Sequence, residues 1–309
     1  MKNLLIAISL FLICSSLAAG GRKEVEFTSR NYNEILDVEK KGKIKIDNTA
    51  GSVTIRSWDR DKVQVQGKIG KDVKEVIFRT SGRTTTLKVE LPKKIWDWNN
   101  NSKALLEITL PADSDLDINT VSAEIAIMDV RGEIEAGTVS GSLFIEEVES
   151  DYLTLNSASG SINMQGSAKT LEANTLSGAI SIKGPIDELR CTSVSGSLNY
   201  MNGNSDIIYM KTTSGQVSIN CNLQNKARVD LNSLSGNVIL IIPARVDARF
   251  SLKSFSGSVD YIDFINMHDL NTVDITNNND KKKIDFVLGR GNGRISAESF
   301  SGSVILEAK

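Results

Sequence analysis

The chain has 309 residues, with 36 lysines and arginines against 38 aspartates and glutamates, and its formal net charge is −2. This near-neutral balance excludes a general electrostatic attraction to nucleic acid or to an anionic membrane. The single histidine excludes a metal site built from several histidines of one chain, and it argues against histidine-dependent catalysis. With 23 glycines, 4 prolines and many β-branched residues, the composition indicates an all-β protein.

Residues 1–19 have the features of an export signal. Lys2 precedes an apolar run over residues 4–13, and Ser16-Leu17-Ala18 offers small residues to a signal peptidase. We therefore predict export to the periplasm, the cell surface or the medium, with no transmembrane segment after cleavage. Lipidation at Cys14 is an alternative, but Ile13 stands where that processing needs a small residue.

Two cysteines remain after cleavage, Cys191 and Cys221. An exported protein folds in an oxidising compartment, so a disulfide between them is one alternative. The spacing alone does not decide whether they are bonded.

A short turn that contains glycine recurs along the chain and organises the sequence. A typical copy reads Val139-Ser140-Gly141-Ser142. From position 123 to position 257, successive copies are 18, 19, 18, 18, 19, 21 and 21 residues apart. The glycine positions of the ten copies are Gly51, Ala123 (a degenerate copy), Gly141, Gly160, Gly178, Gly196, Gly215, Gly236, Gly257 and Gly302.

The residues on both sides of this turn alternate between apolar and polar. Counted from the glycine, positions −7, −5, +2 and +4 are apolar in all ten copies. This alternation predicts two strands per repeat, each with one buried and one exposed face. Because two short strands cannot bury a core alone, successive units must stack, about 4.8 Å apart. The sequence thus predicts a single-stranded β-solenoid (a β-helix or β-roll) with coils of 18–21 residues.

Hydroxyl side chains precede the glycine. Nine of the ten copies have Ser at position −1, and nine have Ser or Thr at position −3. We expect both positions to point to the same side as the apolar columns and to hydrogen-bond to the turn or to one another. We expect the glycine to permit a sharp bend or a positive φ. A row of nucleophilic serines is the alternative reading, but no base accompanies them.

Two insertions interrupt the repeats. Residues 58–113 contain four strand-like segments and are expected to form a β-meander that opens or caps the solenoid. Residues 262–293 contain His268, expected to be a surface residue rather than a ligand, and a glycine-rich run at 289–293. We expect a long hairpin there rather than a phosphate-binding loop. One solenoid domain of residues 20–309 therefore has coils at 42–57 and 114–261 and a final coil at 294–308.

Four aromatic residues are candidate contacts for a ligand or partner. Trp96 and Trp98 lie in a loop rich in Lys and Asn, where they either form a stacking platform for a sugar or shield the end of the solenoid. Phe255 and Phe300 belong to position −2, which is largely apolar although alternation places it on the exposed side. This row either folds against the turn or forms a contact surface.

The chain ends directly after the strand-like segment 304–306, with no polar cap. An uncovered last coil would expose an unpaired strand edge. Self-association through the C-terminal coil is therefore a further expectation.

Several motifs accompany the repeats, namely Ser-Gly turns followed by Ser or Asn and then an aliphatic residue, Leu-Pro-Ala-Asp at 110–113, Ile-Ile-Pro-Ala at 241–244, and Gly-Asn-Gly-Arg-Ile at 291–295. In these features the chain resembles a widespread bacterial family described as putative adhesins with β-strand repeats, otherwise a domain of unknown function. The resemblance covers residues 35–309 and implies an exported β-solenoid. It supplies no site residues.

These observations favour a non-catalytic structural or interaction protein of the bacterial cell envelope, adhesin-like, which presents its repetitive surface to a protein, to a glycan or to itself. The sequence contains no cofactor motif, metal site or catalytic constellation, and we expect no nucleic-acid partner. The alternatives are a polysaccharide-active enzyme and a periplasmic stress-response or sensor component on the same scaffold. For the enzyme, the candidates are outward carboxylates such as Asp117, Glu135, Glu172 and Asp230, although they follow no pairwise pattern.

Overall fold

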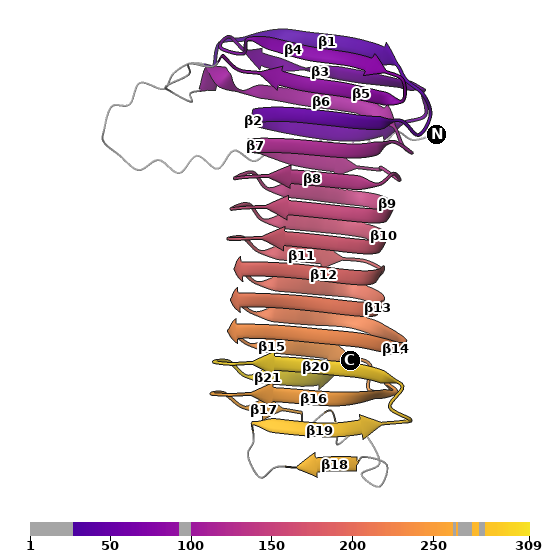
Figure 1. Cartoon of the computed structure of the whole chain (residues 1–309), viewed down its shortest axis with the longest axis vertical. Helices are drawn as coiled ribbons and strands as arrows, with labels where there is room; N and C mark the ends of the chain where they lie inside the picture. The colour runs from indigo at the N-terminus through magenta and orange to yellow at the C-terminus, as the bar shows by residue number, and fades with distance from the viewer. Residues whose placement is uncertain (1–26, 93–99, 262–263, 265–273, 278–281) are drawn as a thin grey trace, which may run out of the picture.

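The computed structural model describes residues 27–92, 100–261, 264, 274–277 and 282–309. These residues form a sheet of 21 strands and one short 3₁₀ helix, η1 (Asn100–Ser102). The strands stack into an elongated rod (Figure 1), so the predicted all-β solenoid is confirmed. Within the described ranges, no helix has the length and apolar composition that crossing a bilayer requires. The predicted signal peptide, Cys14, Trp96, Trp98 and His268 lie outside the described residues.

The central coils stack in parallel and in register. Leu153 pairs with Leu171, and Leu171 pairs with Leu189, so equivalent repeat positions lie above one another. Figure 1 shows this stack as the middle of the rod. Its strands are β7 (Asp115–Met128), β8 (Ile134–Thr138), β9 (Leu143–Ser157), β10 (Ile162–Thr175), β11 (Ile180–Lys183), β12 (Ile186–Ser195), β13 (Leu198–Ser214), β14 (Val217–Ser235) and β15 (Val238–Ile242).

The four apolar columns form the core. Of the forty residues at positions −7, −5, +2 and +4, all are buried except Tyr261, which packs against the core while partly exposed. The alternation seen in the sequence is therefore the alternation of buried and outward side chains along each strand.

Hydroxyl groups at position −3 connect the turns of successive coils. All ten residues at this position are buried. Ser299 Oγ accepts a hydrogen bond from Gly302 N in its own turn and donates one to Gly236 O in the neighbouring coil, both at 2.8 Å. The predicted inward orientation is thus confirmed at position −3. It is wrong at position −1, where the serines are exposed like most of their neighbours at position −2, so the alternation of buried and exposed side chains ends at position −2.

Ser299→Ala is expected to lower the free energy of unfolding by about 1–3 kcal/mol, because the amide of Gly302 and the carbonyl of Gly236 both lose their partner inside the turn. Ser301→Ala removes an exposed hydroxyl two residues away and is expected to change stability by less than about 0.5 kcal/mol. Urea denaturation of both variants measures the difference. Equal stabilities would contradict the structural role of the buried hydroxyl.

The repeat glycines are required by the close approach of neighbouring coils. A Cβ at Gly141 would lie 1.9 Å from Ala123 O, and one at Gly196 would lie 1.9 Å from Gly178 O. Of the two expected roles, a positive φ is absent at these two glycines but present at the repeat glycine Gly215, where φ is 156°. Ala123, which does carry a Cβ, pairs instead with Gly51 of the first coil, where φ is 114°.

A second bend, six residues after the repeat glycine, is not among the sequence predictions. There Asp129, Glu147 and Asn202 have φ values of 60°, 53° and 55°, and Gly184 has 120°. Asp, Asn and Gly are the residues that most readily adopt this left-handed conformation. Their recurrence at position +6 is the signal from which the bend could have been predicted.

Two groups of strands cap the N-terminal end of the rod, because β2 offers one edge from each half of its coil. The first half of β2 pairs with β5, which pairs with β4; the second half pairs with β6, followed by β3 and β1. The insertion therefore caps the solenoid, but it does not form the single meander that was predicted. The strands are β1 (Ser29–Asp37), β2 (Lys43–Trp58), β3 (Lys62–Gly70), β4 (Glu75–Ser81), β5 (Thr84–Glu90) and β6 (Ala104–Pro111).

The last coil of the sequence lies inside the stack. β20 (Gly293–Ser299) pairs with β14 on one side and with β16 (Ala248–Ser254) on the other, as Figure 1 shows. β21 (Val304–Ala308) pairs with β15, and its first two residues also pair with β17 (Val259–Asp260). The prediction of an uncovered C-terminal coil is wrong, and β20 offers no free edge for self-association.

The second insertion makes this placement possible. β18 (Asp274–Asn277) and β19 (Lys283–Leu288) pair antiparallel, and β19 also pairs antiparallel with β16. The expected hairpin is confirmed for these residues. It lies beyond β16 at the end of the rod, and the chain then returns to place β20 between two earlier coils.

Candidate functional site

An apolar ridge runs along the edge of the rod where the Ser-Gly turns lie. Its side chains occupy position −2 and are exposed by between 41% and 60%. They do not fold against the turn, which was one of the two alternatives. In order along the rod, the apolar ridge consists of Val121, Val139, Leu176, Val194, Leu234, Phe300 and Phe255.

Main-chain hydrogen bonds align the ridge. The amide of Ser140 donates to Val121 O at 2.9 Å, and the amide of Ser256 donates to Phe300 O at 2.9 Å. Because such bonds from a position −1 amide to a position −2 carbonyl recur from coil to coil, the ridge side chains are aligned along the rod. Ala158 and Thr213 occupy the same position in two central coils and interrupt the apolar row.

Two of the predicted contact residues meet on this ridge. The rings of Phe255 and Phe300 stack with centroids 4.5 Å apart and planes inclined by 7°. They are 58% and 46% exposed. The insertion of β20 beside β16 brings these residues together from distant parts of the sequence.

A groove of about 490 Å³ runs beside the central part of the ridge. One wall is formed by ridge side chains, including Val139, Leu176 and Val194. The other wall is formed by outward residues at position −4, which lie in register on successive coils. We call this wall the amide column; it consists of Asn119, Gly137, Asn156, Asn174 and Thr192.

Hydrogen bonds connect part of the amide column. Asn174 Nδ2 donates to Asn156 Oδ1 at 3.2 Å, and Thr192 Oγ1 donates to Asn174 Oδ1. Gly137 leaves a gap in the column, because a Cβ there would have only Asn119 Oδ1 at 3.5 Å and Ile118 O at 4.0 Å within reach. The gap separates Asn119 from Asn156 and opens the groove at that coil.

The amide column was not singled out in the sequence. Its members point outward and are not apolar, so they do not belong to the apolar columns by which the repeat is recognised. The available signal is a run of five uncharged residues at position −4, bounded in register by Asp47 beside Asn119 and by Lys211 beside Thr192. All residues that line the groove are uncharged.

Three of the four outward carboxylates considered for catalysis have structural partners. Asp117 forms ion pairs with Lys43 at 3.1 Å and Lys45 at 3.8 Å. Glu172 accepts a hydrogen bond from Asn174 at 3.0 Å, and Asp230 accepts one from Asn232 at 2.6 Å. Glu135 pairs in register with Asp117 on the next coil. Among the described residues, no group of three or more His, Cys, Asp or Glu side chains is placed to hold a metal ion.

The two core cysteines are free and buried, so the alternative of a disulfide between them is wrong. Burial raises the pKa of the Cys191 thiol well above its ordinary range and raises the pKa of Cys221 to about 12. Both thiols therefore stay protonated and serve as small apolar side chains in the core.

The glycine-rich run at 289–293 encloses a carboxylate of the protein itself. Asp247 Oδ1 accepts hydrogen bonds from Arg290 N at 2.7 Å and Asn292 N at 3.2 Å, and Asp247 Oδ2 accepts one from Asn292 Nδ2 at 2.6 Å. These donors, the Asn292 amide first, hold the pKa of the Asp247 carboxyl below its ordinary value of 3.8. The backbone amides that a phosphate would need are thus already occupied.

Asp247→Asn is expected to lower the melting temperature at pH 7, because the turn loses its anionic acceptor. The depressed pKa means that the ionised carboxyl contributes stability above its unfolded-state pKa, and that this contribution is lost as pH falls through the folded-state pKa. The difference in melting temperature between wild type and variant should therefore be constant near neutral pH and should shrink as the pH falls through the folded-state pKa of Asp247. Thermal melts across this range test the prediction, and a difference that does not change with pH would contradict it.

Three solved structures are similar to this chain over most of its length. A protein described as a putative lipid binding protein from Parabacteroides distasonis is 14% identical, with 89% of this chain and 96% of that chain covered and a TM-score of 0.42. A putative adhesin from the same species is 13% identical, with 92% and 98% covered and a TM-score of 0.39. A putative adhesin from Bacteroides fragilis is 11% identical, with 91% and 99% covered and a TM-score of 0.39. No curated protein sequence matches the chain.

A family model matches the chain from residue 42 to residue 296. The match spans the first coil, the N-terminal cap except β1, every central coil and the start of β20. It thus includes most of the ridge and the whole amide column. It covers well over half of the chain and bears out the resemblance to a family with strand repeats. The chain belongs to the Toastrack DUF4097 family.

Proposed function

We propose that this chain is a non-catalytic, adhesin-like interaction protein of the bacterial cell envelope, exported by its signal peptide, which binds a partner along the turn edge of the rod. The observation that carries the proposal is the apolar ridge. Seven apolar side chains, each at least 41% exposed, follow one edge of the rod. Exposed apolar side chains that gather along one edge of a protein are typical of a contact site.

The scaffold suits such a role because it fixes the ridge in space. Every ridge residue follows a buried position −3 side chain and precedes a tight turn, so its backbone has little freedom. Contact groups on a rigid scaffold bind with less loss of conformational entropy.

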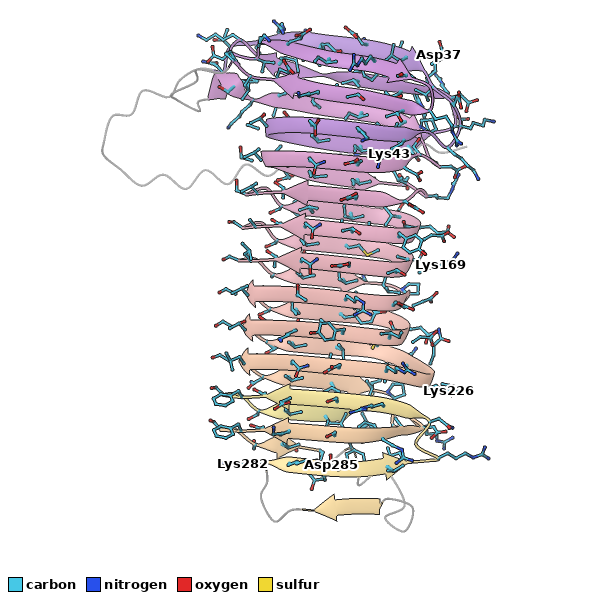
Figure 2. The ribbon with its side chains drawn as sticks, viewed as in Figure 1. Asp37, Lys43, Lys169, Lys226, Lys282 and Asp285 are labelled. Atoms are coloured by element: carbon cyan, nitrogen blue, oxygen red, sulfur yellow. The ribbon has the colours of Figure 1, made fainter. Side chains whose placement is uncertain are left out.

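The opposite edge of the rod has a different character. Figure 2 shows Asp37, Lys169 and Lys226 along the right-hand edge, away from the arrowheads of β12, β13 and β14, which point to the turn edge. Lys169 Nζ lies 2.7 Å from Asp151 Oδ1 there, and both side chains are exposed. The charged edge remains hydrated, whereas the apolar ridge gains from being covered.

The test compares two double variants of the mature chain, residues 20–309, coupled to beads and mixed with purified bacterial cell-wall sacculi and envelope vesicles. Phe255→Ser/Phe300→Ser removes the exposed aromatic stack of the ridge. Phe144→Ser/Met201→Ser removes two apolar side chains, 38% and 42% exposed, from outward positions on the other strand of the coils. We expect wild-type beads to bind, the first variant to lose at least tenfold in bound material, and the second to match wild type.

Two results would contradict the proposal. One is equal binding, or equal absence of binding, by all three proteins. The other is the release of reducing ends from the sacculi by the purified chain, which would favour the polysaccharide-active enzyme instead.

A further inference from the structure

We infer that the groove beside the apolar ridge binds an uncharged linear polysaccharide, which lies along the rod axis across the five coils of the amide column. The inference rests on the proposed function and names the ligand class for the central part of the same edge. It is carried by the charge, the hydrogen-bonding groups and the shape of the groove.

The charge of the groove selects a neutral ligand. Charged residues make up 24% of the chain, yet all fourteen lining residues are uncharged. The neutral tract ends in register at Asp47 on one side and at Lys211 on the other. Within the tract an anionic polymer would find no opposite charge, and at the two ends it would meet Asp47 and Lys211, whose opposite charges offset each other, so it gains no net attraction relative to a neutral polymer.

The amide column supplies the polar groups that sugar hydroxyls need. A carboxamide offers two N–H donors and a carbonyl acceptor, and a hydroxyl both donates and accepts. Within the described structure, Asn156 Nδ2 and Asn119 Oδ1 have no hydrogen-bond partner, and they flank the gap at Gly137. A sugar lying over this gap can donate a hydroxyl hydrogen to Asn119 Oδ1 and accept a hydrogen bond from Asn156 Nδ2 at another of its oxygens.

The opposite wall supplies apolar contact. Val139, Leu176 and Val194 line the groove and are each at least half exposed. A pyranose ring has apolar C–H groups as well as hydroxyls, so it can contact both walls at once. Ligand sites in proteins commonly combine an apolar lining with a few placed polar groups in this way.

The shape of the groove favours a linear polymer. Five coils span four intervals of about 4.8 Å, or roughly 19 Å, with similar side chains at each step. An extended peptide that binds by adding a strand needs a free sheet edge. Here the strands that line the groove are paired with neighbouring coils on both sides.

The test titrates neutral hexasaccharides into the mature chain by isothermal titration calorimetry. The probes are the β-1,4-linked hexamers of glucose and of N-acetylglucosamine, the β-1,3- and α-1,4-linked hexamers of glucose, and hexagalacturonate as the charged comparison. Gly137→Arg fills the gap, and the open space at its Cβ allows the variant to fold. Asn156→Leu removes the unpaired Nδ2 donor and replaces the carboxamide with an apolar side chain of similar size. Ser218→Arg is the matched control, since Ser218 is an outward residue on the other strand of a coil.

We expect at least one neutral hexamer to bind wild type, both groove variants to bind it at least tenfold more weakly, the control to lie within twofold of wild type, and hexagalacturonate not to bind. The inference is overturned if no neutral hexamer binds at millimolar concentration, if Gly137→Arg binds like wild type, or if hexagalacturonate or an uncharged Gly/Ser hexapeptide binds more tightly. The phenylalanine variant of the ridge lies outside the groove, so failure of the proposed function is seen separately, in the envelope-binding experiment.

Discussion

Gly141→Ala is expected to lower the free energy of unfolding by about 3 kcal/mol or more. The added methyl group would lie 1.9 Å from Ala123 O and 2.6 Å from the carbonyl carbon. Neither coil can yield easily, because hydrogen bonds fix their spacing on both sides of the turn. Ser140 N donates to Val121 O at 2.9 Å before the glycine, and Ile125 N donates to Ser142 O at 3.0 Å after it. Separating the coils would break these bonds at about 1 kcal/mol each.

Gly137→Ala is the matched control, four residues earlier in the same coil. Its Cβ would meet nothing closer than 3.5 Å, and its φ is not positive. Stability should therefore stay unchanged or rise by a few tenths of a kcal/mol, because alanine restricts the unfolded chain. Urea denaturation followed by far-ultraviolet circular dichroism compares the two variants. If Gly141→Ala and Gly137→Ala lower the free energy of unfolding equally, then close contact between coils is not the reason for the repeat glycine.

The buried positions of this fold are predictable from the sequence because the same position must be filled by the same kind of side chain in every coil. Leu153, Leu171 and Leu189 occupy one column, and a polar residue at any of them would leave an uncompensated group in the core. The same condition applies at position −3, where Ser157 accepts from Gly160 N at 2.8 Å. Repetition of one physical constraint produces a period that can be read directly.

The side chains that point outward from the coils do not repeat in this way from one coil to the next. An exposed strand position accepts almost any polar side chain. The uncharged Asn156, Asn174 and Thr192 and the charged Lys211 therefore suit such positions equally well, and the sequence does not distinguish them. A groove arises from how these side chains align across coils, and the alignment is clear only when the register is known. The amide column therefore had to be found in the structure, whereas Phe255 and Phe300 could be found by their unusual apolar character.

The order in which the coils stack could not be predicted from the repeat pattern either. Ile295 in β20 and Phe250 in β16 satisfy the same column equally well, so apolar alternation cannot say which of them stacks on Val229. The long second insertion provides the reach for the later segment to take the inner place. Periodicity thus predicts that coils stack, but chain connectivity decides in which sequence they do so.

Ile295→Asp is expected to unfold the C-terminal part of the rod on both sides of the substituted coil. Ile295 is fully buried, and its strand β20 pairs with β14 and with β16. Replacing it removes about 2–5 kcal/mol of packing and adds the cost of burying a carboxylate without a partner. In a stack where each coil contacts only its neighbours, β16, β17 and β19 then lose their connection to the central coils.

Hydrogen–deuterium exchange distinguishes this result from the behaviour of an end coil. In Ile295→Asp, protection should fall in β16 and β17, which precede the substitution by more than thirty residues in the sequence, and persist in β8 to β12. Ile284→Asp is the control, because Ile284 is equally buried but lies in β19, which pairs with β16 and β18 beyond the last complete coil. The Ile284→Asp variant should lose protection from exchange chiefly in β18 and β19. Loss confined to β20 and β21 in Ile295→Asp would mean that these strands lie at the end of the rod, and the stacking order described above would be wrong.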